Sequence, residues 1–321
     1  MTIYKRLPIL MFLLLLGSLW NSANGEVIGD SIVAIYNNWM VGDTIKYTTY
    51  SSRTKIEKTD TIDEGQSSIT FEINLSELLP NGDMIFETRT QIPEIGELGR
   101  QEVLRLYFER VLNLLKKPQE FVTDSMGVVK DFRNFDYFLS EMDSCKSILR
   151  SWVDTLDMPE VPKAKLISGM EKSLDASLSK ESLLENVGMF QYYGDVYKIG
   201  TSSYNVKLPV PFFDNNEVGA TVDFTCEVLE KTEDYEIVSL LTNVTYNSDQ
   251  LMNLVMTSFL TDQQIHDANL DDPERPYISI TQSEEYMIEV LSGTVLQIES
   301  EKRAVTPEGS RIDYSLVKML N

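Results

Sequence analysis

The strongest constraint on the fold is a pattern of residues that occurs twice. Residues 41–48 read V-G-D-T-I-K-Y-T, and residues 218–225 read V-G-A-T-V-D-F-T. A second landmark follows each of them, an acidic and an aromatic residue followed by a glycine, at Glu120-Phe121 and again at Glu285-Tyr286. Two landmarks in the same order and at similar spacing predict an internal duplication.

Alternation of apolar and polar residues predicts β-strands in both halves of the chain. In the first half these are residues 43–58, 67–78 and 83–91, with a turn at Asn81-Gly82 and a further hairpin near Met126-Gly127. In the second half they are residues 221–230, 235–246, 277–281, 285–291, 294–300 and 311–318. Strands that alternate, rather than being apolar throughout, favour antiparallel sheets.

Apolar residues at helical spacing predict helices in residues 101–117, after the N-cap Asn247, and in the segment between the halves. These helices have apolar faces to bury, and we expect them to lie on a sheet. The predicted fold class is therefore α+β. It consists of antiparallel β-sheets in two related, duplicated halves, with helices packed on one face and a helical insert between the halves.

The N-terminus has the features of a secretory signal peptide. Lys5 and Arg6 precede an apolar run over residues 7–20, and Ala23-Asn24-Gly25 fits the small-residue rule for cleavage. A retained N-terminal anchor is the alternative. We expect an exported protein, periplasmic or secreted, without an integral membrane span after cleavage. The expected organisation is a signal peptide (1–25), a first β-rich half (26–135), a helical insert (136–190) and a second β-rich half (191–321).

The chain is strongly acidic, with a formal net charge of −22. This charge argues against nucleic acid as a partner, because lysine and arginine must neutralise its phosphates. It also argues against an electrostatic attachment to anionic lipid head groups. The two cysteines, Cys145 and Cys226, lie on apolar faces of a helix and a strand. A disulfide and two buried thiols both remain open.

Few residues of the chain could support catalysis. His266 is its only histidine and lies in a polar stretch, and no G-x-S-x-G motif is present, so a Ser-His-acid triad is not expected. Two distant cysteines and one histidine do not make a typical zinc site. Residues 267–272 resemble the start of an EF-hand loop but lack its glycine. We therefore expect no enzyme, no metal and no cofactor.

Two sets of side chains are candidates for ligand contacts. Trp152, Met170 and Leu174 lie in the helical insert, where we expect the helices to meet the sheets, and ordinary core packing is the alternative for them. Tyr192-Tyr193 would suit a platform that stacks on a sugar, again with core packing as the alternative.

Three segments together carry a resemblance. The sequences V-G-D-T-I-K-Y from Val41, L-P-N-G-D from Leu79 and D-S-M-G-V-V from Asp124 resemble families of exported bacterial proteins without an established function. The expected architecture also resembles the half-barrels of lipoprotein carriers. That second resemblance implies a curved antiparallel sheet with helices on its concave side.

These observations lead to an expected function. We expect an exported, non-catalytic envelope protein that binds an apolar small molecule, a lipid or a partner protein in the envelope. One alternative is a carboxylate-dependent enzyme acting on carbohydrate, because the chain has 50 acidic residues. Another is a purely structural or assembly protein.

Overall fold

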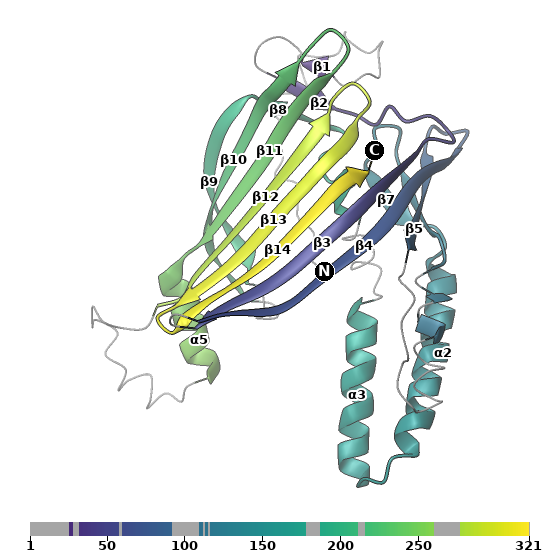
Figure 1. Ribbon diagram of the computed structural model, residues 1–321, viewed down its shortest axis with the longest axis vertical. Helices are drawn as coiled ribbons and strands as arrows, with labels where there is room; N and C mark the ends of the chain where they lie inside the picture. The colour runs from purple at the N-terminus through teal and green to yellow at the C-terminus, as the bar shows by residue number, and fades with distance from the viewer. Residues whose placement is uncertain are drawn as a thin grey trace. The chain divides into compact units, whose positions relative to one another are not determined.

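The structure is a computed structural model (Figure 1), and it describes residues 26–27, 32–57, 60–91, 109–111, 113–114, 116–177, 187–210, 216–259 and 277–320. The chain divides into two compact units. Unit 1 includes Ile35–Lys46 and Thr70–Asp195, and unit 2 is Val27–Ala34, Tyr47–Ile69 and Val196–Asn321. The proposed signal peptide, His266 and the acidic loop at 267–272 lie outside the described residues. The domain boundaries expected from the sequence remain a prediction.

Strands dominate the described part of the chain. Those of the large sheet are β3 (Thr44–Glu57), β4 (Asp60–Leu78), β5 (Met84–Gln91), β6 (Gln119–Thr123), β7 (Val129–Phe132), β9 (Gly200–Pro209), β10 (Glu217–Lys231), β11 (Glu236–Tyr246), β12 (Ser279–Glu289), β13 (Thr294–Thr306) and β14 (Gly309–Leu320). A small sheet contains β1 (Glu26–Val27), β2 (Ile32–Ile35) and β8 (Asp195–Lys198). The helices are α2 (Phe135–Asp154), α3 (Glu160–Ser177), α5 (Ser248–Phe259) and the short 3₁₀ helix η1 (Gly188–Phe190).

The predicted α+β fold is wrong. The described residues are mainly β, and eleven strands form one antiparallel sheet instead of separate sheets in two halves with helices packed on one face. The strand order is β7-β6-β5-β4-β3-β14-β13-β12-β11-β10-β9. The last strand, β14, therefore lies beside β3 (Figure 1). Alternation indicates which residues form a strand, but it does not specify the neighbouring strand, and this is why the sequence missed the single sheet.

Most strands predicted from alternation are confirmed. The predicted strands at 43–58 and 83–91 are β3 and β5, and the predicted hairpin near Met126-Gly127 joins β6 to β7. The two predicted strands at 277–281 and 285–291 are a single strand, β12. Strand β9 was missed, because its sequence is mostly polar and carries no clear alternation.

The core of unit 1 is a group of aromatic side chains. Phe86, Phe121 and Phe132 are cross-strand neighbours on β5, β6 and β7, and all three are buried. Phe190 packs on Phe86 with ring centroids 5.1 Å apart, and Trp39 packs on Phe86 at 5.5 Å. Aromatic rings at these distances stabilise the fold beyond the area that they bury.

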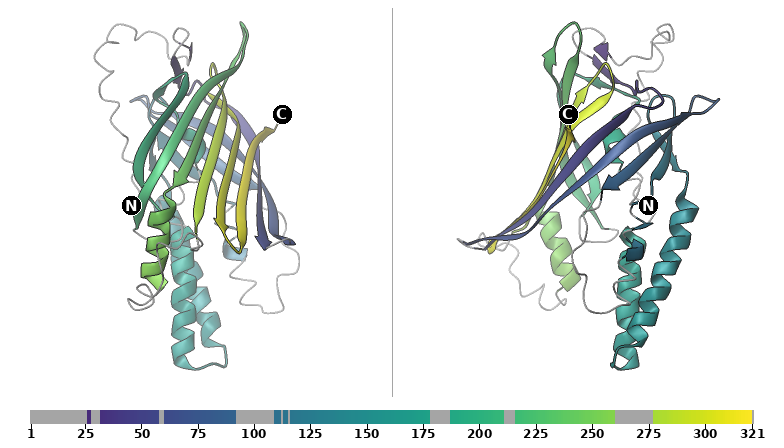
Figure 2. Two further views of the ribbon diagram at one scale, coloured as in Figure 1. Left: turned by 90° about the vertical axis from the view of Figure 1, so that its left-hand side faces the viewer. Right: turned by 45° about the vertical axis from the view of Figure 1, so that its right-hand side comes forward.

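Helices α2 and α3 run side by side and pack on each other (Figures 1 and 2). The buried side of α2 consists of Phe138, Met142, Cys145, Leu149 and Val153. Leu174 of α3 joins this cluster, and the ion pairs Lys146–Asp175 (2.5 Å) and Arg150–Glu171 (2.6 Å) join the two helices. The cluster also contains Leu114 and Phe132, so α2 buries its apolar side against α3 and against residues outside both helices. The sequence-based expectation of helices on a sheet did not foresee this helix pair.

In unit 2, α5 follows β11 and precedes β12 in the chain, and it lies at one end of these strands (Figure 2). Asn247 caps this helix as predicted, since its Oδ1 accepts a hydrogen bond from the N–H of Gln250 at 2.9 Å. Gln250 in turn accepts a hydrogen bond from the N–H of Gly219 on β10 at 2.6 Å. Leu251 of α5 packs in an apolar cluster with Tyr246 and residues of β10 and β12. This helix therefore covers one end of one sheet face.

Candidate ligand-binding site

The face of unit 2 that α5 partly covers is built from cross-strand rows. The row nearest α5 pairs Ala220 with Tyr246, and Ile280 with Ala304 and Arg311, and Tyr246 and Ile280 pack in the same apolar cluster. A row further along the strands is Cys226–Leu240–Tyr286–Ile298–Val317. Both rows are mainly apolar, and most of their side chains are buried. They enclose the middle of the face between two apolar borders.

The two rows between these borders become polar on β12, β13 and β14. They read Val222–Val244–Gln282–Lys302–Asp313 and Phe224–Thr242–Glu284–Ser300–Ser315. Their polar members are only partly buried or exposed. Core-facing positions of a strand are usually apolar, so a polar patch on this face requires a reason other than packing.

A hollow of about 540 Å³ lies over this polar patch. Its lining comes from β3, β4, β13 and β14, which are all in unit 2 over these residues: Ser51, Ser52, Arg53, Glu64, Gly65, Gln66, Ser67, Ser300, Lys302, Asp313, Tyr314 and Ser315. We call this site the hollow. Its volume is in the range of small-molecule sites. Its many hydroxyl groups and charged side chains suit a polar ligand.

Asp313 is the most constrained charge of the hollow. Arg53 contacts one of its carboxylate oxygens at 2.7 Å, and Arg311 contacts the other at 3.2 Å. Partial burial acts to raise the pKa of Asp313, but the hydrogen bonds from Arg53 and Arg311 outweigh it and hold the pKa below its usual value. Asp313 is therefore ionised at neutral pH and orients Arg53 in the wall of the hollow.

Lys302 and Glu64 differ from this network. Within the part of the chain that the structure describes, neither side chain has a hydrogen bond or an ion pair, although the charge of Glu64 acts on Arg53 and Lys55. Lys302 lies directly opposite Asp313 in the β13–β14 register, beside the serine pair Ser300 and Ser315. The hollow thus presents an ammonium group without a protein partner next to two hydroxyl groups.

The residues expected to touch a ligand lie elsewhere. Trp152, Met170 and Leu174 are on α2 and α3 of unit 1. Leu174 is 8% exposed and belongs to the cluster of Phe138, Met142 and Cys145, while Trp152 and Met170 are partly buried. Their role in ligand binding remains a prediction. The one sequence signal of the hollow is the run of polar residues at alternate positions of β13 and β14, and this signal does not indicate the partners on β3 and β4.

The other candidate residues have structural surroundings. Tyr193 is buried and packs on Phe190 with ring centroids 5.2 Å apart, so it belongs to the core of unit 1. Cys145 and Cys226 are both buried free thiols. Burial raises the pKa of each thiol, that of Cys226 to about 11. Among the described residues, no group of His, Cys, Asp and Glu side chains is arranged to hold a metal ion.

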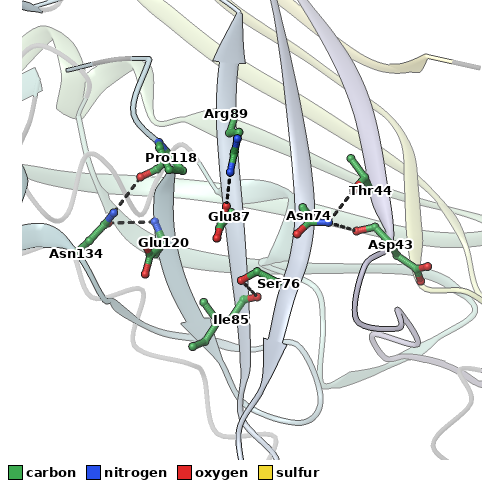
Figure 3. A network of polar contacts seen from close by, with 10 residues as sticks. All are labelled: Asp43, Thr44, Asn74, Ser76, Ile85, Glu87, Arg89, Pro118, Glu120 and Asn134. Atoms are coloured by element: carbon green, nitrogen blue, oxygen red, sulfur yellow. Dashed lines mark hydrogen bonds and ion pairs between the residues drawn. The ribbon is translucent and has the colours of Figure 1, made fainter. Parts of the chain in front are cut away.

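A second polar cluster lies on the sheet of unit 1 (Figure 3). Glu87 and Glu120 are direct neighbours on β5 and β6, which makes them a candidate for paired carboxylates. Arg89 contacts Glu87 at 3.0 Å, and the backbone N–H of Glu120 donates to Asn134 Oδ1 at 3.1 Å. Asn74 donates to Thr44 Oγ1 at 2.7 Å in the same cluster. The first contact lies within β5, the second joins β6 to the residue before α2, and the third joins β4 to β3, so we assign the cluster a structural role.

Comparisons with known proteins do not assign a family. No family model and no curated protein matches the chain, so no enzyme family is identified. Among solved structures, an outer membrane channel from Pseudomonas putida F1 matches over 92% of this chain and 100% of its own, at 10% identity and a TM-score of 0.15. A score this low carries no argument about fold or function. Over the described residues, no helix has the length and apolar character to span a bilayer.

Proposed function

We propose that this protein is an exported, non-catalytic binding protein of the cell envelope, and that its ligand sits in the hollow of unit 2. The ligand carries an anionic group next to hydroxyl or other hydrogen-bonding groups. Such a group occurs on free small molecules and on the polar head of a lipid. The two sources share one recognition chemistry, and an experiment can separate them.

The observation that carries this proposal is Lys302. It is an exposed ammonium group in a concave, serine-lined site of a chain whose net charge is −22. An anionic ligand group would gain a charge-assisted hydrogen bond there. Arg53 also lines the hollow, and its guanidinium has N–H donors besides the Nε that contacts Asp313.

The same geometry restricts the carbohydrate-hydrolase alternative. Two carboxylates line the hollow, Glu64 and Asp313. A glycoside hydrolase needs one carboxylic acid that stays protonated to assist the leaving group and a second carboxylate that is ionised. Arg53 and Arg311 hold Asp313 ionised, so the role of the acid would fall to Glu64.

The test uses protein purified gently after export and measured by native mass spectrometry. We compare wild type, Lys302→Gln and the matched control Lys318→Gln, which lies on β14 but on the opposite face of the sheet. A bound molecule in wild type that is lost in Lys302→Gln and kept in Lys318→Gln supports the proposal. Removal by chloroform–methanol identifies a lipid head group, and removal by aqueous dialysis identifies a free molecule.

Two results would contradict the proposal. One is a wild-type protein without any adduct that also binds no member of a panel of phosphate, sulfate and sugar-acid probes. The other is an adduct that Lys302→Gln and Lys318→Gln retain equally. In either case a partner protein or a structural role would be the better account of this chain.

A further inference from the structure

Each of four consecutive strands contributes one charged side chain to the lining of the hollow. The strands β4, β3, β14 and β13 lie side by side in this order (Figure 1). Their charged side chains are Glu64, Arg53, Asp313 and Lys302, so the charges alternate in sign across the hollow. Adjacent strands are about 4.8 Å apart, and three such spacings separate β4 from β13, which is about 14 Å.

The two inner charges neutralise each other. Arg53 contacts Asp313 at 2.7 Å, and Arg311 contacts the same carboxylate at 3.2 Å. Asp313 raises the pKa of Arg53 most, and the charge of Glu64 adds a smaller rise, so Glu64 is near Arg53 without an ion pair to it. Among the described residues, no ion pair joins Glu64 to Lys302 either. The hollow therefore has an anionic group at one side and a cationic group at the other.

The segment that carries Glu64 is held by its own hydrogen bonds. The carboxylate of Asp63 accepts from the N–H of Gly65 at 3.1 Å and from Nε2 of Gln66 at 3.0 Å. Gly65 has a φ of 151°, a conformation that residues with a side chain rarely adopt. Asp63 and Gly65 thus fix the backbone on both sides of Glu64, whose side chain is exposed.

Two opposite charges that line one hollow without contacting each other favour a ligand that carries both signs. A purely anionic ligand would be attracted by Lys302 and repelled by Glu64. A ligand with an additional ammonium group would be attracted by both side chains. The carboxylate of Glu64 therefore selects between these two classes of ligand.

We propose that the ligand of the hollow is a zwitterion, whose anionic group contacts Lys302 and whose ammonium group contacts Glu64. This inference rests on the proposed binding function and adds the second charge of the ligand. Each ion contact occupies about 2.8 Å of the strand separation, which leaves roughly 8 Å between the two charges of the ligand. An ω-amino acid or a short peptide with free termini has this form.

The test measures dissociation constants by NMR titration at low salt, on protein purified after export and dialysed exhaustively. The main probe is 6-aminohexanoate, whose charged groups are about 7–8 Å apart in an extended chain. The matched anion is 6-hydroxyhexanoate, which has the same length without the ammonium group. Glycerophosphoethanolamine, a shorter zwitterion, represents the head group of a lipid.

Four proteins are compared with these probes. They are wild type, Glu64→Gln, Lys302→Gln and the matched control Asp60→Asn. Asp60 is exposed on the same strand as Glu64 but does not line the hollow. Both acidic residues are exposed, so neither substitution removes buried packing.

We expect wild type and Asp60→Asn to prefer 6-aminohexanoate to 6-hydroxyhexanoate by about threefold or more. Glu64→Gln should bind 6-aminohexanoate about threefold more weakly, and it should bind 6-hydroxyhexanoate equally or more tightly because a repulsion is removed. Lys302→Gln should weaken both. The preference of wild type should shrink as salt screens the charges. Tighter binding of glycerophosphoethanolamine than of 6-aminohexanoate, lost in Glu64→Gln, would identify a lipid head group as the zwitterion.

Three results would overturn the inference. If Glu64→Gln bound 6-aminohexanoate as tightly as wild type while Lys302→Gln bound it more weakly, the ligand would be an anion only, and the proposed binding function would stand. If Lys302→Gln had no effect on any probe, the inference and the proposed function would both fail. A wild-type protein that binds neither zwitterion at tens of millimolar would also refute the inference, whereas a native adduct lost in Lys302→Gln would still support the proposed function.

Discussion

Replacing Phe86 by alanine tests whether the aromatic group is the core of unit 1. Phe86 is fully buried and its ring lies within 5.1–5.6 Å of the rings of Phe190, Trp39 and Phe121. A Phe→Ala change at such a site removes buried apolar surface and leaves a cavity, at a cost of about 3–5 kcal/mol. With a urea dependence of about 2 kcal/mol per molar, the unfolding midpoint falls by about 1.5–2.5 M.

The chain offers a reporter specific to this unit. Its three tryptophans are Trp20, in the predicted signal peptide, and Trp39 and Trp152, both in unit 1. Once the signal is removed, tryptophan fluorescence follows the unfolding of unit 1 alone. Phe86→Leu is the graded variant, because it keeps most of the apolar burial and loses only the ring contacts, each worth about 0.5–1.5 kcal/mol.

The control is Val161→Ala, at a position that is 68% exposed, and it should shift the stability by no more than about 0.5 kcal/mol. If Phe86→Ala shifted the tryptophan transition no more than this control, the ring group could not be the stabilising core. A leucine variant less stable than the alanine variant would equally contradict the reasoning, because cavity formation would then not be the cause.

Three further predictions concern other parts of the chain. Gly309→Ala should lower the free energy of unfolding by about 1–3 kcal/mol, because the new Cβ would overlap the carbonyl oxygen of Ile56 on β3. Gly169→Ala in α3 should raise it by about 0.5–1 kcal/mol, because a Cβ there meets nothing within 4 Å. Urea unfolding followed by circular dichroism compares the two variants. Burial raises the pKa of Cys226 to about 11, so Ellman's reagent at pH 8 should react with this thiol only after unfolding, and rapid labelling of folded protein would refute its burial. The pKa of Asp313 is lower in the folded protein, so its ion pairs stabilise the fold fully above the pKa of an unfolded aspartate, and this stability is lost as the pH falls through the folded pKa. Asp313→Asn should reduce this loss of stability at acid pH by less than about 1 kcal/mol, measured by circular dichroism from pH 6 to 2. An unchanged pH profile would show that the ion pairs do not stabilise the fold.

The local structure was largely predictable because it depends on local sequence patterns. Alternation in residues 43–58 predicted β3, and Asn247 predicted the start of α5. The turn at Asn81-Gly82 was predicted because asparagine and glycine accept positive φ, and Gly82 has a φ of 87°. Strand β9 was not predicted, since its residues are mostly polar and exposed and depend on β10 for pairing.

The candidate site was not predictable in the same way. Trp152, Met170 and Leu174 are predicted as ligand contacts because we expect the helices of the insert to meet the sheets there. The structure shows α2 and α3 packed on each other, with Leu174 in the shared cluster and Trp152 and Met170 only partly buried. The hollow instead combines Arg53 of β3 with Asp313 of β14, which are 260 residues apart in the sequence.

Residue type and short-range spacing indicate most of the strands, the turn at Asn81-Gly82 and the cap of α5, together with the strongly acidic charge and the scarcity of catalytic side chains. They do not indicate that β14 pairs beside β3 in one sheet, or that polar residues of β13 and β14 line the same hollow as Arg53, because both depend on contacts between distant segments. Strand pairing depends on the free energy of the whole sheet, to which all strands contribute. A pattern within one strand specifies which face is polar, and its partner strands then determine what that face meets.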